Sequence, residues 1–545
     1  MPCPGLTVTF IVDIQDVSQK VKAGVVSTMN ETEKNKKILE NIEQIEKEAT
    51  KNTGYTTQVK SFYYDNEYYL FLMEKFTDIR LVGFPPNGIG KFGGDTDNWA
   101  WPRHTGDFGL FRIYANKDNK PSSFSKENIP YKPKKSFAIN IKGIKENDFT
   151  MVYGFPGRTT EYLSSDGVAQ VMQVLYYYKK WKGELLGLKI NNAIEKKKRE
   201  ETQFMNWVKA DANRTAKYQH LLEDIQANYK KHEQSIKLNE YINEAIWSSE
   251  LIKKGVIYTK ILQAIDTLKS LDSLVIYQKE MNAFYKSINK NTDYKITQKL
   301  YEIYASDIAS EPWISVSTIA NIYENSFISS IEKFNKLISV EQKEDIKLLI
   351  LQDPAYQTYH YYDSVQKANM VFLKQQLLQL NAYYSTYILA LKEYNQGKQF
   401  YPDANSTLRL TYGKVEGVKP QDGMIYTYYT TLDGAVRKHN NLKEEFTLPE
   451  KLLKLHENKD YGQYAIVEKG NKTVPLAFLA SNHTTGGNSG SPVLNAQGEL
   501  IGTNFDRIWE GTMSDVLFDP NLCRNITLDI RYTLFIIEKF GGQNG

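Results

Sequence analysis

Alternating apolar and polar positions predict β-strands in the first part of the chain. Residues 6–13 alternate with the period of a strand, and the runs 61–64 and 68–72 are strand-like as well. Between the first two runs, Asn30 is expected to cap the start of a helix. The apolar face of that helix would carry Ile38, Leu39, Ile42 and Ile45.

The spacing changes near residue 160. From there to about residue 405, glycine and proline are scarce and apolar residues recur at helical intervals, which predicts a helical block. Its many tyrosines are expected to pack between helices rather than to bind a ligand. They include Tyr359, Tyr361, Tyr362, Tyr383 and Tyr384.

Strand patterns return in the last part of the chain. They appear at 413–418, 424–430 and 464–468, whereas the tail 525–539 fits either a strand or a helix. A β region, a helical insert and a second β region therefore follow one another. The predicted division is 1–159, 160–405 and 406–545.

A long irregular stretch, residues 90–107, interrupts the first β region. It is rich in Gly, Asp and Trp and fits neither the helical nor the strand period. Stretches of this kind are usually functional loops rather than linkers. A strand is predicted directly after it, at 108–114, and β character continues to about residue 158.

The most informative stretch for chemistry is 484–492, with the sequence TTGGNSGSP. Its glycines accept positive φ and let a substrate come close to the backbone, so that Ser489 can sit on a tight, exposed turn as a nucleophile. The residues that follow predict a strand, a turn at 496–498 and a second strand. A serine turn that leads into a hairpin is the layout of chymotrypsin-like proteases. The alternative is an ordinary Gly/Ser loop.

Composition excludes several classes of protein. At 545 residues the chain should hold two or three domains, and its net charge of +4 is too small to suggest a nucleic-acid partner. Cys3 and Cys523 allow at most one disulfide and form no metal motif, and no metal or cofactor is expected. The sequence contains no run of 18 apolar residues and no visible signal peptide, so no membrane span is expected.

Three motifs together resemble the bacterial dipeptidyl peptidases of the 7 and 11 types. They are the loop 93–107, the turn 154–159, and the pair 487–492 and 504–507, and the resemblance covers nearly the whole chain. These enzymes are serine exopeptidases that remove dipeptides from free N-termini. The resemblance implies an α+β fold, a chymotrypsin-like double β-barrel with a large inserted all-α domain.

The resemblance assigns the reacting groups. Ser489 matches the nucleophile, and Asp107 matches the triad aspartate that orients a histidine, although a turn Asp before a strand is the simpler interpretation of Asp107 alone. The N–H groups of Gly487 and Ser489 would form the oxyanion hole. Loss of one such donor typically lowers the rate on the order of 10²–10³-fold.

The resemblance also assigns substrate recognition. Asn98, Trp99 and Asp506 match the residues that hold the free α-amino group of a peptide. Arg507 stands where the acid-preferring type has arginine, and a guanidinium can grip an Asp or Glu side chain at P1 with two parallel hydrogen bonds. Without the resemblance, Arg507 would be read as a surface arginine.

This sequence departs from the family at the general base. In the family that histidine lies in an N-terminal segment upstream of the strand at 6–13, and we expect the segment to be missing, which would leave the first barrel incomplete. His104 matches a histidine that is not the base, and His483 is a candidate only by its closeness to Ser489 in sequence. A second gap puts Tyr176 near the place of an amine-binding asparagine. The chain as written is therefore expected to be inactive or nearly so.

The leading hypothesis is a serine-type dipeptidyl aminopeptidase that prefers Asp or Glu at P1. One alternative is a trypsin-like endopeptidase, since the serine turn is widely shared. Another is a non-catalytic peptide-binding remnant. The resemblance further suggests a homodimer in the periplasm or at the cell surface.

Overall fold

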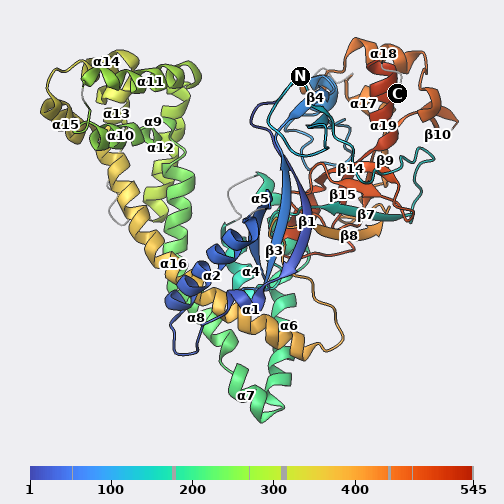
Figure 1. Ribbon diagram of the computed structural model, residues 1–545, viewed down its shortest axis with the longest axis horizontal. Helices are drawn as coiled ribbons and strands as arrows, with labels where there is room; N and C mark the ends of the chain where they lie inside the picture. The colour runs from blue at the N-terminus through green and yellow to red at the C-terminus, as the bar shows by residue number, and fades with distance from the viewer. Residues whose placement is uncertain are drawn as a thin grey trace. The chain divides into compact units, whose positions relative to one another are not determined.

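The computed structural model describes residues 1–51, 53–174, 179–268, 270–308, 316–439, 444–468 and 470–542. The chain forms two compact units (Figure 1). One combines Met1–Ile225 with Asn381–Gly545, and the other is Gln226–Leu380. Tyr176, near the expected second gap, lies outside the described residues.

A seven-stranded antiparallel sheet forms the centre of the first unit, in the order β8-β7-β13-β14-β15-β12-β9. Its strands are β7 (Phe149–Gly154), β8 (Arg409–Lys414), β9 (Tyr429–Thr431), β12 (Pro475–Ala480), β13 (Pro492–Leu494), β14 (Leu500–Arg507) and β15 (Asn525–Asp529). All residues of β12 are buried, as are Val152, Val493 and Ile501 around it. Strand β12, with the sequence PLAFLA, is a continuous apolar run because both of its faces are covered.

The sheet also folds back on itself. Beyond the end of β8, Val415 forms an antiparallel bridge with Ala480 of β12. The Glu416 N–H donates to Leu479 O over 3.2 Å. β8 therefore pairs with β7 along its length and reaches β12 just beyond its end, which joins two distant strands of the sheet.

Three smaller sheets complete the β structure. The first has the order β1-β3-β2, with β1 (Val8–Asp16), β2 (Thr56–Phe62) and β3 (Glu67–Phe76). The second contains β4 (Ile79–Gly83), β5 (Leu110–Ala115) and β6 (Ile129–Pro130), and the third pairs β10 (Ile466–Glu468) with β11 (Asn471–Thr473). The strands predicted at 6–13, 68–72 and 108–114 are thus confirmed within a few residues.

Helix α2 (Glu31–Thr50) confirms the predicted cap and most, but not all, of the predicted apolar face. Asn30 accepts from the Glu33 N–H at 3.0 Å, and the Glu33 side chain accepts from the Asn30 N–H, which forms a capping box and confirms the predicted cap. Ile38, Ile42 and Ile45 pack on the β1-β3-β2 sheet. The prediction was wrong for Leu39, which is 55% exposed. It lies about 100° around the helix from Ile38 and faces solvent.

The remaining helices of the first unit surround these sheets. They are α1 (Ser18–Val21), α3 (Asn87–Gly90), α4 (Ser165–Val174), α5 (Lys179–Ile190), α6 (Ala193–Lys209), α7 (Ala212–Tyr218), α17 (Leu432–His439), α18 (Glu450–Glu457) and α19 (Ile530–Phe535). Short 3₁₀ or π turns lie at Glu444–Phe446, Gly462–Tyr464, Trp509–Asp515 and Ile536–Phe540. The tail predicted as a strand or a helix contains both, because β15 leads directly into α19.

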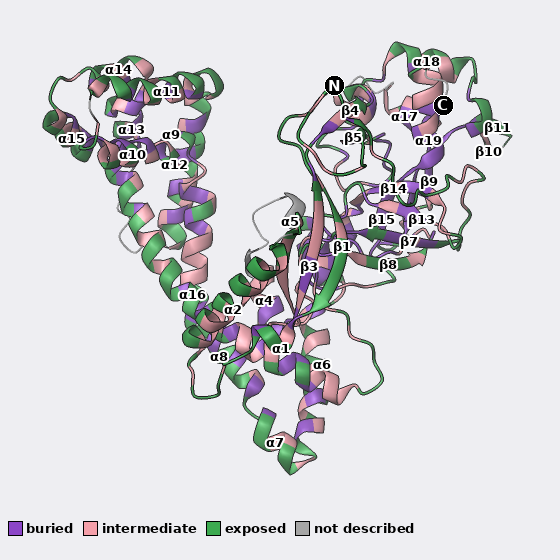
Figure 2. Cartoon of the chain, in the orientation of Figure 1, coloured by how far each residue is buried: buried purple, intermediate pink, exposed green. Residues whose placement is uncertain are grey.

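The second unit is helical throughout its described residues. Its helices are α9 (Glu250–Lys253), α10 (Val256–Ala264), α11 (Val275–Ser287), α12 (Lys290–Asp307), α13 (Val316–Asn325), α14 (Ile331–Ile338) and α15 (Lys343–Gln352), with turns at Ile242–Ile246, Leu271–Leu274 and Phe327–Ser329. Helices α8 (Leu221–Tyr241) and α16 (Pro354–Tyr394) cross its sequence boundaries. Figure 2 shows the buried residues on the inward faces of these helices.

Buried tyrosines form part of the helix–helix packing. Tyr362 is fully buried in the core of the second unit, and its ring lies edge-on to that of Tyr304 at 5.6 Å. Tyr384, in the first unit, is 2% exposed and stacks on Tyr64 at 5.1 Å. The predicted packing role is confirmed for these two, whereas Tyr361 is 37% exposed.

The compact units do not follow the predicted boundaries. Contacts separate residues 226–380 from the rest, whereas the sequence divides at 159/160 and 405/406, where helical spacing starts and stops. Helices α4 to α7 belong to the first unit although they lie in the predicted insert. The division into 1–159, 160–405 and 406–545 stays a prediction about spacing.

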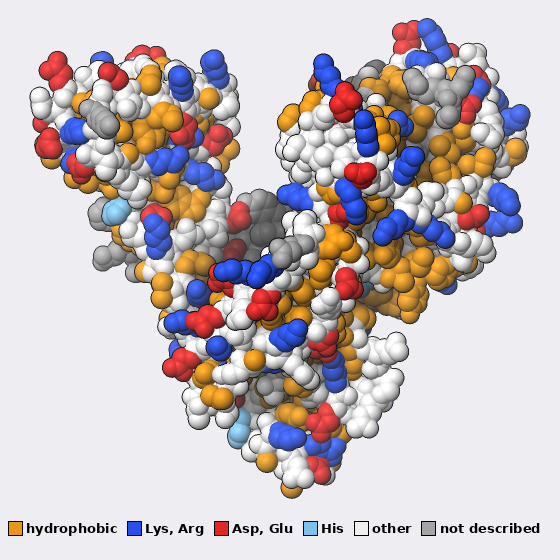
Figure 3. Space-filling model, in the orientation of Figure 1, with side chains coloured by type: hydrophobic (Ala, Val, Ile, Leu, Met, Phe, Trp, Pro, Cys, Tyr) orange, Lys and Arg blue, Asp and Glu red, His pale blue; other side chains and the backbone are white. Residues whose placement is uncertain are grey.

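The surface agrees with a nearly balanced charge. On the face shown in Figure 3, Lys and Arg side chains are interspersed with Asp and Glu. None of the helices in the described part of the chain combines the length and the apolar character that crossing a bilayer requires.

The cap of α2 provides a test of local stability. Asn30→Ala should lower the free energy of local opening of the first turn of α2 by about 1 kcal/mol. Hydrogen exchange of the amides at 31–36 measures this opening. Leu39→Ala, an exposed change in the same helix, is the matched control, and equal exchange in the two variants would contradict the capping role.

Candidate active site

Ser489 lies on an exposed turn between β12 and β13. Its Oγ donates to the carbonyl of Phe505 in β14 at 3.3 Å. The hydroxyl thus stands at the surface beside the strand that carries Asp506 and Arg507. A serine in this position is accessible to a substrate carbonyl.

Asn488, which is only 2% exposed, connects the serine turn to the sheet. Its Oδ1 accepts from the Thr485 N–H at 3.0 Å, and its carbonyl accepts from Asn504 Nδ2 at 3.1 Å. The Gly490 N–H donates to Asn504 O at 2.8 Å. These bonds fix the backbone on both sides of Ser489, so that the turn is preorganised.

Gly487 fulfils a requirement that no other residue could meet. Its φ is +103°, and a Cβ there would lie 2.5 Å from Phe155 O and 2.7 Å from Gly157 N. The turn is held against this neighbouring segment by the Gly157 N–H, which donates to Gly486 O at 2.6 Å. The close contact leaves no room for a side chain at residue 487.

The two N–H groups proposed for an oxyanion hole have no internal acceptor. Within the described ranges, neither the Gly487 N–H nor the Ser489 N–H donates a hydrogen bond to the protein. Both belong to an exposed part of the turn. They are therefore available to a developing negative charge next to Ser489.

Asp506 is the centre of a buried polar network. Its Oδ2 accepts from Arg103 Nη1 at 2.6 Å and from the Trp99 N–H at 3.2 Å. Its Oδ1 accepts from the Arg507 N–H at 2.8 Å. The side chains of Arg103 and Asp506 are 8% and 11% exposed. The ion pair therefore ties the irregular loop 90–107 to β14, and the functional role of the loop stays a prediction.

Sequence reasoning missed Arg103, the main partner of Asp506. Arg103 also donates to Asp97 O at 2.9 Å and to Thr105 Oγ1 at 2.6 Å. Its guanidinium carbon lies 5.2 Å from the centroid of the Phe505 ring. The available signal was an arginine inside the Gly- and Trp-rich loop, but its partner is more than 400 positions away in sequence.

Asn98 and Trp99 lie at the edge of this network. Both are half-buried, and Trp99 has a φ of +57°, which turns its N–H toward Asp506. The Asn98 side chain makes no hydrogen bond with the residues that the structure describes. Asn98, Trp99 and Asp506 are thus brought close together, as the assignment to one site requires.

Asp107 lies close to the same charges. Partial loss of water raises the pKa of its carboxyl, and the nearby Asp506 raises it further, whereas Arg103 and Lys91 oppose the shift. No described side chain donates a hydrogen bond to Asp107. The structure thus places Asp107 near the Asp506 network without a histidine on it.

The histidines have other partners. The seven are His104, His220, His232, His360, His439, His456 and His483, all within the described ranges. His104 is buried against Gly434, and burial lowers its pKa to about 3. His483 Nε2 lies 3.0 Å from Ser514 O, and His456 Nε2 lies 2.6 Å from Asp433 Oδ1.

Two further histidines of the first unit have local partners. His220 faces Glu223, and His439 Nδ1 accepts from the Leu448 N–H. None of the five described histidines in the unit that holds Ser489 contacts Ser489 or Asp107. Ser489 and the N–H groups of Gly487 and Ser489 therefore stand in the described part of this unit without an imidazole beside them.

Arg507 is buried and already paired. It is 7% exposed, and its Nη1 donates to Ser514 Oγ and to Asp515 Oδ1, both at 2.7 Å. Nη1 also lies 3.3 Å from Thr484 O, and Nη2 lies 3.3 Å from Asp515 Oδ2. Its Nε–H has no acceptor among the described residues and remains available.

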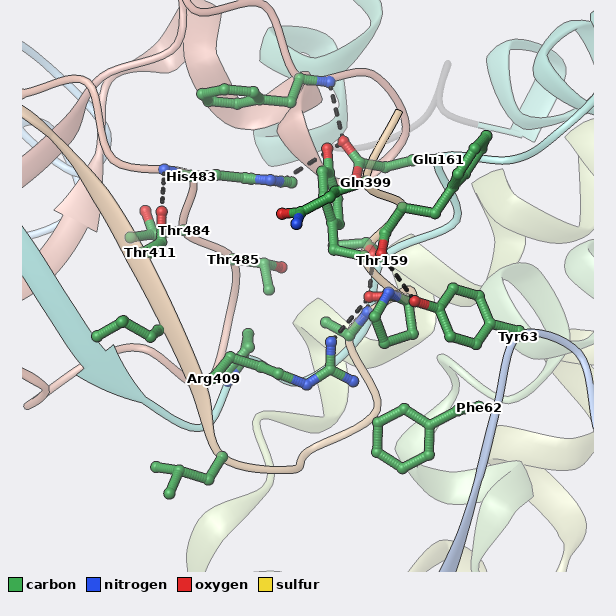
Figure 4. Close-up of a pocket in the computed structure, with 18 of the residues that line it drawn as sticks. Phe62, Tyr63, Thr159, Glu161, Gln399, Arg409, Thr411, His483, Thr484 and Thr485 are labelled. Atoms are coloured by element: carbon green, nitrogen blue, oxygen red, sulfur yellow. Dashed lines mark hydrogen bonds and ion pairs between the residues drawn. The ribbon is translucent and has the colours of Figure 1, made fainter. Parts of the chain in front are cut away.

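A cavity of about 800 Å³ opens beside the serine turn, entirely within the first unit (Figure 4). Aromatic side chains make up much of its wall, and Thr484 and Thr485 of the serine turn close one side. Polar groups in the wall include Thr159, Glu161, Arg409 and His483.

Other candidate chemistry is sparse. Cys3 and Cys523 are both free thiols, and burial raises the pKa of Cys523 to about 12. A thiol with this pKa stays protonated and unreactive at neutral pH. In the part of the chain that the structure describes, no group of three or more His, Cys, Asp or Glu side chains could hold a metal ion.

Comparisons with known proteins give consistent matches. The profile of the family described as Peptidase S46 matches residues 1–176 and 169–544. The Asp/Glu-specific dipeptidyl-peptidase of Flavobacterium psychrophilum is 40% identical over 99% of this chain and 82% of its own. Dipeptidyl-peptidase 7 of Phocaeicola vulgatus is 34% identical with the same coverage.

Solved structures agree. The crystal structure of Porphyromonas endodontalis DPP11 in complex with the dipeptide Arg-Glu matches with a TM-score of 0.84 and 30% identity. It covers 99% of this chain and 85% of the other. The complex with Arg-Asp matches with a TM-score of 0.85 and the same identity and coverage.

The Arg103–Asp506 pair provides a stability test. Asp506→Asn leaves a buried guanidinium without its counter-charge and should lower the free energy of unfolding by about 3–5 kcal/mol. Urea unfolding followed by tryptophan fluorescence measures it. Glu450→Gln is the control, since Glu450 and Lys454 form an exposed pair that should contribute under about 0.5 kcal/mol. Similar losses in both variants would show that the buried pair is not stabilising.

Proposed function

Because this chain belongs to the peptidase S46 family and is a serine peptidase, we propose that it acts on peptides with a free N-terminus. The proposed reaction is the release of dipeptides, with a preference for Asp or Glu at P1. The names of its relatives, dipeptidyl-peptidases of the Asp/Glu-specific and 7 types, support this proposal.

One observation carries the proposal: the candidate nucleophile is hydrogen-bonded to the residue of β14 that directly precedes the candidate amine site. Ser489 Oγ bonds to Phe505 O, and Asp506 follows directly. Two extended residues span at most roughly 7 Å, so an amine held near Asp506 would place the second peptide bond close to Ser489. This spacing favours a dipeptidyl exopeptidase over an endopeptidase.

The proposed chemistry is acyl transfer. Ser489 Oγ attacks the carbonyl of the second peptide bond, and the N–H groups of Gly487 and Ser489 hold the oxyanion that forms. The amine leaves, the dipeptide stays on Ser489 as an ester, and water releases it. The Ser489 proton needs a base, and Asp107 would orient a histidine in that role.

Amine recognition depends on more than the charge of Asp506. Arg103 already neutralises this carboxylate, so an incoming ammonium would share it rather than meet an isolated negative charge. The free amide of Asn98 and the face of the Trp99 ring would supply the remaining attraction, through a hydrogen bond and a cation–π contact. An internal amide offers no positive charge and would be refused.

Recognition of an acidic P1 side chain is assigned to Arg507. The guanidinium lies two residues beyond Phe505, whose carbonyl accepts from the nucleophile. Its free Nε–H and the second Nη2 proton can form a bidentate contact with a carboxylate. Asp515 would then share the guanidinium with the substrate.

The finer architecture also belongs to this proposal. We assign the sheet that reaches from β8 back to β12 to one barrel of a chymotrypsin-like pair, and the β4–β5–β6 sheet to the other barrel. On the same resemblance we place the protein in the periplasm or at the cell surface, as a homodimer. Light scattering of the purified protein tests the dimer.

A second candidate is a peptide-binding protein without turnover. The lack of contact between Ser489 and the five described histidines of its unit favours it. The two candidates share the binding site and differ only in the acyl-transfer step. Turnover, rather than binding, distinguishes them.

The first expected result concerns binding and selectivity. By calorimetry, the dipeptide Arg-Asp should bind more tightly than Arg-Leu, and Arg507→Ala should reduce this preference about 10–100-fold because a charge-assisted contact of about 1.5–3 kcal/mol is lost. An N-acetylated Arg-Asp should bind weakly. Ser489→Ala is the control and should bind both dipeptides as the unaltered protein does. Equal affinity for Arg-Asp and Arg-Leu would refute the P1 assignment.

The second expected result concerns turnover. The binding-only candidate, in which no described histidine serves Ser489, predicts release of a dye from Arg-Asp-dye on the order of 10⁶-fold slower than in a peptidase with a complete triad, whereas the peptidase candidate predicts release that depends on Ser489. Labelling of Ser489 by a fluorophosphonate should be correspondingly slow and absent in Ser489→Ala. Rapid release that Ser489→Ala abolishes would show that a base reaches the nucleophile.

A further inference from the structure

Three of the four partners of the Arg507 guanidinium lie in the segment 512–515, namely Thr512 O, Ser514 Oγ and the Asp515 carboxylate, and the fourth is Thr484 O. Nη1 donates to Ser514 Oγ, and the Ser514 hydroxyl donates in turn to Thr484 O at 3.0 Å. Asp515 holds both Nη atoms. The orientation of the Arg507 guanidinium therefore depends on the positions of the Ser514 and Asp515 side chains.

His483 holds this segment from one side. Its Nε2 lies 3.0 Å from Ser514 O, and because a carbonyl can only accept, Nε2 must carry the proton and donate. Its backbone N–H donates to Thr411 Oγ1 at 3.0 Å. The imidazole stacks on Phe518, with centroids 4.4 Å apart and planes at 14°. The backbone of His483 is thus bound to β8, and its ring is held by stacking on Phe518.

Glu161 holds the same segment from the cavity side. Its Oε1 accepts from the Phe518 N–H at 3.3 Å and lies 3.7 Å from His483 Nε2. The preceding residue, Thr160, donates its N–H to Asp515 O at 2.7 Å. Figure 4 shows Glu161 and His483 side by side in the cavity wall. Residues 514–518 are therefore clamped between the two side chains.

We propose that His483 and Glu161 are positioning residues for Arg507 and, through it, for an acidic P1 side chain. The proposal rests on the proposed function, in which Arg507 receives that side chain. Both residues act through Ser514 and Asp515, and neither is assigned a contact with the substrate.

The single Nε2 proton of His483 makes this arrangement sensitive to the charge on Glu161. Burial, and secondarily Asp403, raise the pKa of Glu161 to about 8, and burial lowers the pKa of His483. Near pH 7 both groups are neutral and Nε2–H is directed at Ser514 O. Above about pH 8 a carboxylate forms on Glu161, with Oε1 3.7 Å from His483 Nε2, and competes for the Nε2 proton. The ionisable groups around the pair are Lys197, Tyr401, Asp403, Arg507 and Asp515.

The test measures the ratio of the Kd of Arg-Leu to that of Arg-Asp, which cancels the titration of the shared α-amino group. His483→Phe keeps the ring but loses the donor and should lower the ratio about tenfold at pH 7, with the Kd of Arg-Leu unchanged. His483→Gln supplies an amide donor and should restore most of it. Tyr412→Phe, an exposed residue of the cavity wall, is the control and should leave the ratio unchanged.

Measuring the same ratio at different pH values distinguishes positioning of Arg507 by the His483–Glu161 pair from a role of the two side chains in packing alone. Between pH 7 and pH 9 the ratio should fall severalfold in the unaltered protein and stay constant in Glu161→Gln, which cannot ionise. A ratio that is constant in both proteins, or unaffected by His483→Phe, overturns the proposal.

A substrate-free measurement separates this proposal from the proposed function. The ¹⁵Nε–H NMR signal of Arg507, assigned by its loss in Arg507→Lys, should shift in His483→Phe and should move with pH in the unaltered protein but not in Glu161→Gln. If the signal responds while Arg-Asp and Arg-Leu bind equally, the P1 assignment fails and the coupling stands. If the signal does not respond, the coupling fails whatever the peptide preference.

Discussion

The buried ion pair between Arg103 and Asp506 is the interaction on which the site depends. A buried charge is costly unless it is paired. The loop 90–107 is therefore held where Arg103 can pair with Asp506 of β14. The same carboxylate receives the N–H groups of Trp99 and Arg507. One side chain therefore sets the position of the loop, of the candidate amine site and of the strand end beside Ser489.

A second consequence concerns charge balance. Both cations of the site already have an acidic partner, Arg103 with Asp506 and Arg507 with Asp515. A peptide bound as proposed would therefore not meet bare charges, and the proposed selectivity would depend on the direction of the remaining donors. This is why the supports of Arg507, rather than its charge alone, are expected to govern the choice between acidic and apolar peptides.

Particular residues show which structural features could be predicted from the sequence and which could not. The capping box at Asn30 was predictable because it needs only residues three positions apart. The exposure of Leu39 was not, because an apolar residue at the margin of a helical stripe can face either way. Ser489, Gly487 and Asp506 could be proposed from local motifs, whereas Arg103 could not, since its partner lies on a strand folded from the other end of the chain.

By itself the sequence determined the succession of β, helical and β regions and the family, because periodicity and motifs are local properties of the chain. Only the tertiary structure decided which polar groups meet. It paired Arg507 with Asp515, directed His483 to Ser514 instead of Ser489, and left the N–H groups of Gly487 and Ser489 without an acceptor among the described residues. The physical reason is that these contacts join segments distant in sequence, whose approach is set by burial and by the pairing of strands.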